Sequence, residues 1–205
     1  MTQNPDFTSK TWVLASHNVG KIKELTEMMA PLGIQIGDAA SHDLPEPEET
    51  ESTFEGNAAL KSEAAFRRTG LVSLADDSGL SVDALNGDPG IYSARWAGEP
   101  RDFNKAMETV WTQLTASGSA DRTARFVSVI ALTTEQGETH LYRGEVVGEI
   151  VWPPRGEGGF GYDPIFQPEG ETRTFAEMTS DEKRQLSHRA RALDAMLTDQ
   201  FPDRS

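Results

Sequence analysis

The sequence of 205 residues contains no cysteine, which excludes a disulfide framework and any metal site built on thiolates. It also contains no apolar run near the length needed to span a bilayer. Residues 1–10 are polar and lack the basic-then-apolar layout of a signal peptide. We therefore expect a cytoplasmic protein without a membrane partner, whose first ten residues form a disordered extension.

Basic residues are scarce, because 19 Lys and Arg stand against 33 Asp and Glu and give a formal net charge of −14. Such a charge argues against a nucleic acid or an anionic membrane as the partner. A small phosphate ligand stays possible, since it needs only a local basic pocket, backbone N–H groups or a metal ion. The length suits one domain with a substantial core, which we predict over residues 11–200.

Alternating strand and helix patterns predict an α/β fold, with one domain in two lobes around a central hairpin. Strands are expected at Thr11–Ala15, Ile34–Ile36, Leu71–Ala75, Phe126–Leu132 and Thr139–Val151. Helices are expected at Lys21–Leu32, from the capping box Ser52–Glu55 to about Arg68, from a cap at Asp102 to Leu114, and from Thr179 or Ser180 to Leu197.

Two adjacent carboxylates, Asp76 and Asp77, follow the apolar run Leu71–Ala75 and precede a serine and a glycine. Open α/β sheets keep their ligands at the carboxyl ends of strands. Neighbouring carboxylates repel each other, and a divalent cation between them and a polyanion makes the pairing favourable. The alternative is a polar Asp-Ser-Gly turn without a function.

The segment Ser16–Lys21 connects the first predicted strand to a helix. A helix start offers free N–H groups, and Ser16, Asn18 and Lys21 add donors that suit a phosphate. The segment is not a Walker loop, because the glycine spacing and the Lys-Ser/Thr ending are missing. The alternative is an ordinary helix cap beside a solvated lysine.

Two further cations are candidate phosphate contacts. Lys61 lies in a predicted helix among alanines, where it is either solvated or contacts a phosphate if that helix borders a cleft. Arg95 follows a Pro-Gly turn and could clamp a phosphate or stack on Trp96.

The glycine-rich segment Gly158–Pro164 surrounds Phe160 with residues that allow a ligand to approach the backbone. An exposed ring there suits stacking on a nucleobase, whereas the alternative places Phe160 in the core. Lys183 and Arg189 only donate hydrogen bonds, so they favour a base edge with carbonyl acceptors, unless they form a solvated face. On one straight helix, the side chains of Lys183 and His188 would point about 140° apart around the helix axis. We therefore expect either that the helix begins later than predicted or that the ligand contacts the end of the helix.

In their order along the chain, these segments resemble the inosine triphosphate pyrophosphatase family, the XTP/dITP diphosphatases, from about Thr11 to Leu197. The segments that carry the resemblance are Ser16–Lys21, Thr53–Ala58 with Lys61, Ala75–Leu80, Pro89–Arg95, Gly159–Phe166, and Lys183 with Ser187–Arg189. The resemblance implies a long mixed β-sheet flanked by helices, with two lobes around a central cleft, and a homodimer. It implies Mg²⁺-dependent hydrolysis of ITP, dITP and XTP to the nucleoside monophosphate and diphosphate.

The resemblance also implies a site. Its phosphate loop falls on Ser16, His17, Asn18, Val19, Gly20 and Lys21, with Lys61 beside it. Its catalytic and metal position falls on Asp77, next to Ser78. Because Mg²⁺ prefers carboxylate oxygens, we expect Asp76 or a glutamate of the acidic loop such as Glu49 to complete the metal shell. Its base pocket falls on Phe160, Gly161, Tyr162, Asp163, Lys183, His188 and Arg189.

The expected chemistry follows from these assignments. Asp77 would take a proton from the water that attacks the α-phosphorus. Phe160 would stack on the purine, while Lys183 and Arg189 would donate to its 6-oxo group. Adenine carries an amino group at that position and would leave both donors unpaired. Guanine would be excluded at its 2-amino side, for which Asp163 or nearby backbone is the candidate.

Two positions depart from the family pattern. His17 stands where the family has a glycine, which is a strained choice if that residue needs a positive φ. Gly56 stands where the family often has a glutamate, so the resemblance does not fix which residues bind the metal beside Asp77. Two other functions are also compatible with the residues: a Maf-like pyrophosphatase for modified or pyrimidine nucleotides, and a nucleotide-binding protein without catalysis.

Overall fold

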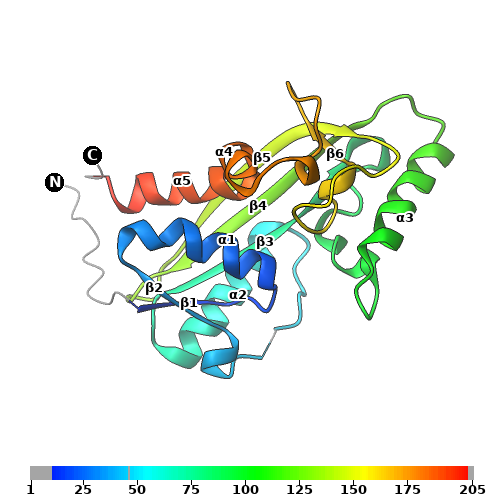
Figure 1. The fold of residues 1–205 in the computed structure, drawn as a ribbon. Helices are drawn as coiled ribbons and strands as arrows, with labels where there is room; N and C mark the ends of the chain where they lie inside the picture. Colours follow the sequence, from blue (N-terminus) through cyan, green and yellow to red (C-terminus); the bar gives the residue numbers. More distant parts are fainter. Residues whose placement is uncertain (1–10, 46, 203–205) are drawn as a thin grey trace. The chain divides into compact units, whose positions relative to one another are not determined.

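The computed structural model describes residues 11–45 and 47–202 (Figure 1). The expected N-terminal extension, residues 1–10, lies outside the described residues. The chain forms two compact units. Unit 1 consists of the described parts of Met1–Asp77, Val129–Arg143 and Ala192–Ser205, and unit 2 consists of Ser78–Ser128 and Gly144–Arg191. Within the two described ranges, no helix is both long and apolar enough to cross a membrane.

In the described part of the chain, six strands form one sheet in the order β2-β1-β3-β4-β5-β6. Their bounds are β1 Thr11–Leu14, β2 Gln35–Asp38, β3 Ser73–Val82, β4 Thr123–Thr133, β5 Thr139–Ile150 and β6 Phe166–Pro168. β1 pairs in parallel with both β2 and β3, whereas β5 and β6 are antiparallel. The sheet is therefore mixed and flanked by helices, as the family resemblance predicted.

Unit 1 contains α1 (Val19–Met29), α2 (Phe54–Thr69) and most of α5 (His188–Gln200) (Figure 1). Its core joins Trp12 and Leu14 of β1 to Leu25 of α1 and to Leu193 and Met196 of α5. β1 is buried at three successive positions, which is typical of a central parallel strand covered on both faces. The core therefore fixes both α1 and β1, the elements that flank the predicted phosphate loop.

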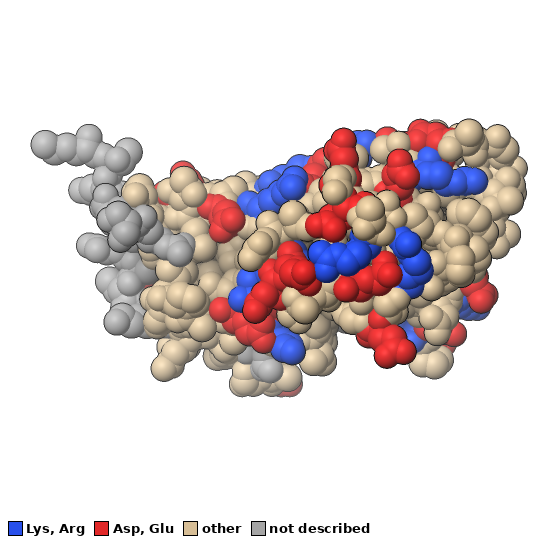
Figure 2. Space-filling view, turned by 45° about the horizontal axis from the view of Figure 1, so that its top comes forward, with Lys and Arg blue, Asp and Glu red and all other residues tan. Residues whose placement is uncertain are grey.

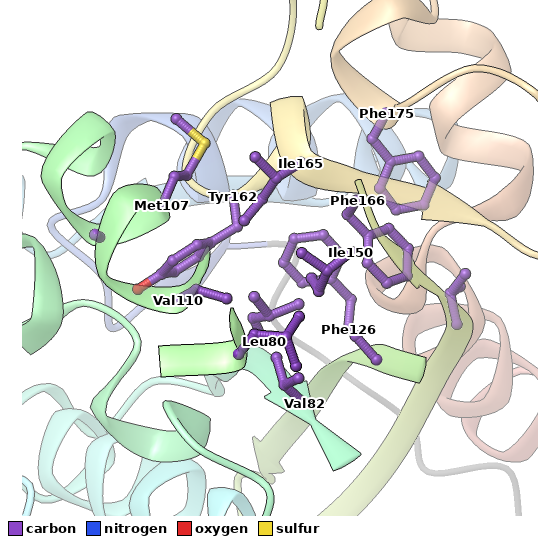
Figure 3. Packing of buried hydrophobic residues seen from close by; sticks show 14 of the residues in the cluster. Leu80, Val82, Met107, Val110, Phe126, Ile150, Tyr162, Ile165, Phe166 and Phe175 are labelled. Atoms are coloured by element: carbon purple, nitrogen blue, oxygen red, sulfur yellow. The ribbon is translucent and has the colours of Figure 1, made fainter. Parts of the chain in front are cut away.

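Unit 2 contains α3 (Phe103–Ala116) and α4 (Ser180–Leu186). The predicted cap at Asp102 is confirmed, since its carboxylate accepts the first backbone N–H groups of α3. Figure 3 shows Phe126, Phe166 and Phe175 in contact within the core of this unit. The ring centroids of Phe126 and Phe166 are 4.6 Å apart, and those of Phe166 and Phe175 are 5.3 Å apart. Such aromatic packing gives the unit a well-defined interior.

The predicted end of the third strand at Ala75 is wrong. β3 continues to Val82, so Asp76 and Asp77 lie within the strand and are almost fully buried. Burying a carboxylate is unfavourable unless a partner compensates it. Lys21 and Lys61 supply that compensation, because their Nζ atoms lie 2.8 Å from Asp76 and Asp77 carboxylate oxygens. The strand can therefore continue through charged residues.

The single predicted last helix is also wrong, because the chain forms α4 and then α5 with Ser187 extended between them (φ −68°, ψ 150°). The Ser187 hydroxyl accepts the backbone N–H of Ala190 and so caps the start of α5. Lys183 and His188 belong to different helices, and the angle calculated for one straight helix does not apply.

The predicted capping box at Ser52–Glu55 is wrong by one residue. Thr53 caps α2 and accepts the N–H of Gly56 at 3.0 Å. In a capping box, the side chain three residues after the cap accepts the backbone N–H of the cap residue. Gly56 occupies that position and has no side chain, so this second hydrogen bond is missing.

Candidate functional site

Five charged side chains of unit 1 form what we call the carboxylate–lysine cluster: Lys21, Glu49, Lys61, Asp76 and Asp77. Lys21 comes from the first turn of α1, Glu49 precedes α2, Lys61 lies on α2, and both aspartates lie on β3. The fold thus brings together residues from three of the motifs on which the family resemblance rests.

Lys61 lies at the centre of this cluster. Its Nζ donates to Asp77 Oδ1 at 2.8 Å and forms an ion pair with Glu49 Oε1. Lys61 is 8% exposed and Asp77 is 5% exposed. The alternative that Lys61 is a solvated lysine is therefore wrong, and its proposed contact with a phosphate stays a prediction.

Burial and ion pairing shift the pKa values of Asp77 and Lys61 in opposite directions. Burial raises the pKa of Asp77 above its ordinary value, although the charges of Lys61 and Lys21 oppose the shift. Burial lowers the pKa of Lys61, but Asp77 and Glu49 more than offset it, so this pKa lies above its ordinary value. Lys61 is therefore positively charged at neutral pH, and Asp77 binds a proton more readily than an exposed aspartate does.

One carboxylate oxygen of this cluster, Asp77 Oδ2, is buried and has no hydrogen-bond partner within the described part of the chain. A buried carboxylate oxygen without a donor suits a hard cation. Across residues 11–45 and 47–202 no three His, Asp or Glu side chains are grouped to hold a metal. Mg²⁺, however, is usually held by one or two carboxylates together with substrate phosphates and water, and Asp77 with Glu49 fits that pattern.

The predicted phosphate loop forms an Asn-capped helix start. Asn18 Oδ1 accepts the N–H groups of Gly20 and Lys21 at 3.0 and 3.2 Å, and Ser16 Oγ accepts the N–H of Asn18. Lys21 is not solvated, because it pairs with Asp76 and its side chain is 14% exposed. His17 requires no left-handed backbone, since only Asp43 and Asn86 have a positive φ among the described non-glycine residues.

A second group, the aromatic–cation cluster, lies in unit 2 and consists of Ser78, Phe160, Asp163, Lys183 and Arg189. Lys183 Nζ lies 4.7 Å from the centroid of the Phe160 ring and 2.7 Å from Asp163 Oδ2. The guanidinium carbon of Arg189 lies 5.9 Å from the same centroid, and its Nη2 donates to Ser78 Oγ at 3.1 Å. Both cations are buried, so the alternative of a solvated charged face is wrong.

Other predicted base-pocket residues lie in the core of unit 2. Tyr162 is buried, and its hydroxyl donates to the carbonyl of Ser93 at 2.8 Å. His188 is buried and stacks on Phe126 with ring centroids 4.8 Å apart. Their observed contacts give both side chains a packing role, and their expected contact with substrate stays a prediction.

Of the two roles considered for Arg95, stacking on Trp96 gives way in the structure to a contact with Tyr92. Its guanidinium lies 5.0 Å from the ring centroid of Tyr92, and both side chains are exposed on the segment Gly90–Ala97. Trp96 packs instead against the core of unit 2. A phosphate contact by Arg95 stays a prediction.

Ser93 was not singled out from the sequence, although it supports the Ser78–Leu80 segment. Its hydroxyl accepts the N–H of Leu80 at 2.9 Å and donates to the carbonyl of Gly90 at 2.7 Å. A Cβ on Gly79 would lie 2.3 Å from that carbonyl oxygen and 2.5 Å from Ser93 Oγ. The sequence feature that could have pointed to Ser93 is its position inside the Pro89–Arg95 motif.

The helix α2 that carries Lys61 is anchored by Ser62. Ser62 Oγ donates to the carbonyl of Ser73 at 2.9 Å and lies 2.6 Å from Thr133 Oγ1. We expect Ser62→Ala to lower the free energy of unfolding by about 1–2 kcal/mol, because a buried acceptor loses its donor. Urea denaturation would measure this, with the exposed Thr26→Ala on α1 as a control expected to change stability by less than about 0.5 kcal/mol. Equal values for both variants would contradict the anchoring role.

The helix α4 that carries Lys183 begins with a capping box in which Glu182 accepts the N–H of Thr179 at 2.8 Å. Hydrogen bonds from Thr179 and Arg173 lower the pKa of Glu182 to about 2, from an ordinary value of 4.5. This contribution to stability is complete above pH 4.5 and is lost as the pH falls toward 2.

We therefore expect Glu182→Gln to be less stable than the parent protein at pH 7, with a difference that shrinks below pH 4.5. Thermal unfolding at several pH values between 7 and 3 would measure it. A difference that stays constant or grows toward low pH would contradict the assignment.

Figure 2 shows Lys and Arg side chains interspersed with Asp and Glu on the face in view. Opposite charges are mixed there despite the net charge of −14. This agrees with a phosphate ligand that depends on local lysines and not on a broad basic surface.

Comparison with known proteins identifies the family. The sequence pattern of the Ham1 family matches residues 12–199. A dITP/XTP pyrophosphatase from Gluconobacter oxydans is 54% identical over 185 residues, covering 90% of this chain and 88% of that protein. A dITP/XTP pyrophosphatase from Rhizobium meliloti is 51% identical over 197 residues, covering 89% and 92%. The structure resembles a HAM1 protein from Coxiella burnetii with a TM-score of 0.86, 41% identity and coverage of 94% and 98%. Since these matches extend over nearly the whole chain, the protein belongs to the Ham1 family, as its motifs predicted.

Proposed function

We propose that this protein hydrolyses the non-standard purine nucleoside triphosphates ITP, dITP and XTP to the nucleoside monophosphate and diphosphate, and so removes them from the nucleotide pool. The observation that carries the proposal is the buried Asp77 with its unused Oδ2, paired to Lys61, in a chain 54% identical to a protein named dITP/XTP pyrophosphatase. The names of the relatives favour this function over the Maf-like alternative.

Mg²⁺ is the cofactor that we propose. The carboxylate–lysine cluster holds three carboxylates and two lysines, so it carries more negative than positive charge and would repel a bare triphosphate. When bound, Mg²⁺ neutralises phosphate charge and polarises the phosphoryl oxygens. Asp77 and Glu49, which share an ion pair with Lys61, would hold it if that lysine turned to the phosphates. The Asp76 carboxylate is paired with Lys21 and would join only if that lysine released it as well.

Asp77 is the proposed catalytic carboxylate. Its Oδ1 accepts from Lys61, and its Oδ2 is unused. If Lys61 turned to the phosphates, both oxygens of Asp77 would become available, and Asp77 could then help to hold the metal and accept the proton of the attacking water. The pKa of Asp77, raised by burial, favours that proton transfer. Lys61 and Lys21 then neutralise charge on the phosphates.

The aromatic–cation cluster supplies the proposed selection of the base. Phe160 stacks on the purine, and Lys183 and Arg189 donate to a 6-oxo group. Adenine presents an amino group there and would leave buried donors unpaired. Exclusion of guanine at its 2-amino side, by Asp163 or nearby backbone, stays a prediction.

We also propose that the protein is a homodimer and acts in the cytoplasm. Both proposals rest on the family resemblance, together with the sequence features that predict a cytoplasmic protein. Sedimentation equilibrium would measure the dimer directly, and a mass equal to one chain at micromolar concentration would contradict it.

The position of bond cleavage tests the proposed reaction. In water enriched in ¹⁸O and with Mg²⁺ present, we expect diphosphate as one product and the label in inosine monophosphate, because water attacks the α-phosphorus. Removal of Mg²⁺ with a chelator should abolish turnover. Release of inorganic phosphate would contradict the proposed cleavage, and binding of ITP without turnover would identify a nucleotide-binding protein without catalysis.

A further inference from the structure

Asp163 connects two parts of the aromatic–cation cluster. One oxygen, Oδ2, accepts both the backbone N–H of Phe160 at 2.8 Å and the Nζ of Lys183 at 2.7 Å. Asp163 is 2% exposed and Lys183 is 6% exposed. A single buried carboxylate therefore fixes the loop that carries the ring and the cation that lies over that ring.

This arrangement requires an unusually close approach by Gly159. A Cβ on Gly159 would lie 2.0 Å from Asp163 Oδ2 and 2.9 Å from its Cγ, closer than any side chain tolerates. The residue before it is also held, because Gly158 donates its N–H to the carbonyl of Ala176 at 2.9 Å. The loop cannot retreat from Asp163 without breaking that contact.

We propose that Gly159 and Asp163 are positioning residues for base recognition. The bare Cα of Gly159 leaves room for the carboxylate, which holds the Phe160 loop and Lys183 in one arrangement before a nucleotide binds. Lys183 donates to Asp163, and that bond holds its Nζ over the Phe160 ring. Preorganisation of this kind strengthens binding because less conformational freedom is lost when the ligand arrives. The identity of the ligand in this inference rests on the proposed function, whereas the contacts of Asp163 with Phe160 and Lys183 do not depend on it.

The chain offers a matched control for the test. Gly159 has φ +68°, and Gly118, in the loop after α3 of the same unit, has φ +69°. No atom lies within 4 Å of a Cβ placed on Gly118. Gly159→Ala and Gly118→Ala therefore place an alanine at the same left-handed φ, and only the first displaces Asp163.

We expect Gly159→Ala to raise the KM for ITP by roughly 10- to 100-fold, as loss of a charge-assisted hydrogen bond does, with a smaller change in kcat. Gly118→Ala should leave KM unchanged. Amide hydrogen exchange supplies a measurement without substrate, in which the Phe160 N–H should exchange faster in Gly159→Ala than in Gly118→Ala. If Gly159→Ala does not fold, Asp163→Asn should show the same two effects, because it removes the charge at nearly constant volume.

The two hypotheses fail in different ways. Absence of ITP hydrolysis by the unmodified protein would contradict the proposed function, while exchange of the Phe160 N–H would still test the contact. Hydrolysis by the unmodified protein, with equal KM values and equal Phe160 exchange for Gly159→Ala and Gly118→Ala, would overturn the positioning role alone.

Discussion

Asp77→Asn is expected to lower kcat for ITP by about 10²- to 10⁴-fold, the usual contribution of a general base. The amide has nearly the same volume but cannot accept the proton of the attacking water. The fold should persist, because Lys61 keeps its ion pair with Glu49 when the charge of Asp77 is lost. Saturating Mg²⁺ should be used, since the variant also weakens one proposed metal ligand.

The control for this variant is Asp83→Asn. Asp83 follows β3 directly and forms an exposed ion pair with Arg125, whose nitrogen lies 2.7 Å from its carboxylate. Diphosphate release gives kcat, calorimetry gives the affinity for ITP, and thermal unfolding reports the fold. We expect kcat of the control to equal that of the parent protein. If a folded Asp77→Asn protein keeps more than about a tenth of the parent kcat, Asp77 is not the base.

Lys183→Met should lower kcat/KM for ITP by roughly 10- to 100-fold and reduce the preference for ITP over ATP by a similar factor. Met keeps the length of the side chain and its apolar contact with Phe160, but it loses the donor. Arg189→Met should act in the same direction, because Arg189 is the other buried cation beside that ring. The rate with ATP should change little, since adenine offers no acceptor at this position.

Arg184→Met is the matched control for this second prediction. Arg184 is adjacent to Lys183 on α4, but its side chain is 40% exposed and pairs with Asp181. Its removal should leave the ratio of kcat/KM for ITP and ATP unchanged. An unchanged ratio in Lys183→Met, or an equal loss in Arg184→Met, would contradict recognition of the base by Lys183.

The parts of the fold that depend on local patterns were predictable from the sequence. The Asp102 cap and the pairing of β4 with β5 follow from residues close together in the chain. The length of β3 was not predictable, because the lysines that compensate Asp76 and Asp77 lie 55 and 16 residues away from them. Judged from neighbouring residues alone, two adjacent aspartates predict the end of a strand. Only the tertiary structure shows that Lys21 and Lys61 neutralise them.

The site was predictable to a similar extent. The order of motifs predicted that Lys61 and Asp77 belong to one site, and the structure brings them into contact. The burial of Tyr162 and His188 was not predictable, because both residue types have polar and apolar parts and their packing depends on distant partners. The motif Pro89–Arg95 contains Ser93 but does not indicate its role, because the carbonyl of Ser93 accepts the hydroxyl of Tyr162, which lies 69 residues away in the sequence.

The most direct test of the proposed function is diphosphate release in the presence of Mg²⁺, compared for ITP, dITP and XTP against ATP, GTP, CTP and UTP. We expect a strong preference for the first three, because their bases present a 6-oxo group and differ from guanine on the 2-amino side. Activity restricted to pyrimidine nucleotides would contradict it and favour the Maf-like function. Binding of these nucleotides with no hydrolysis of any of them would contradict the proposed catalysis and leave the family assignment in place.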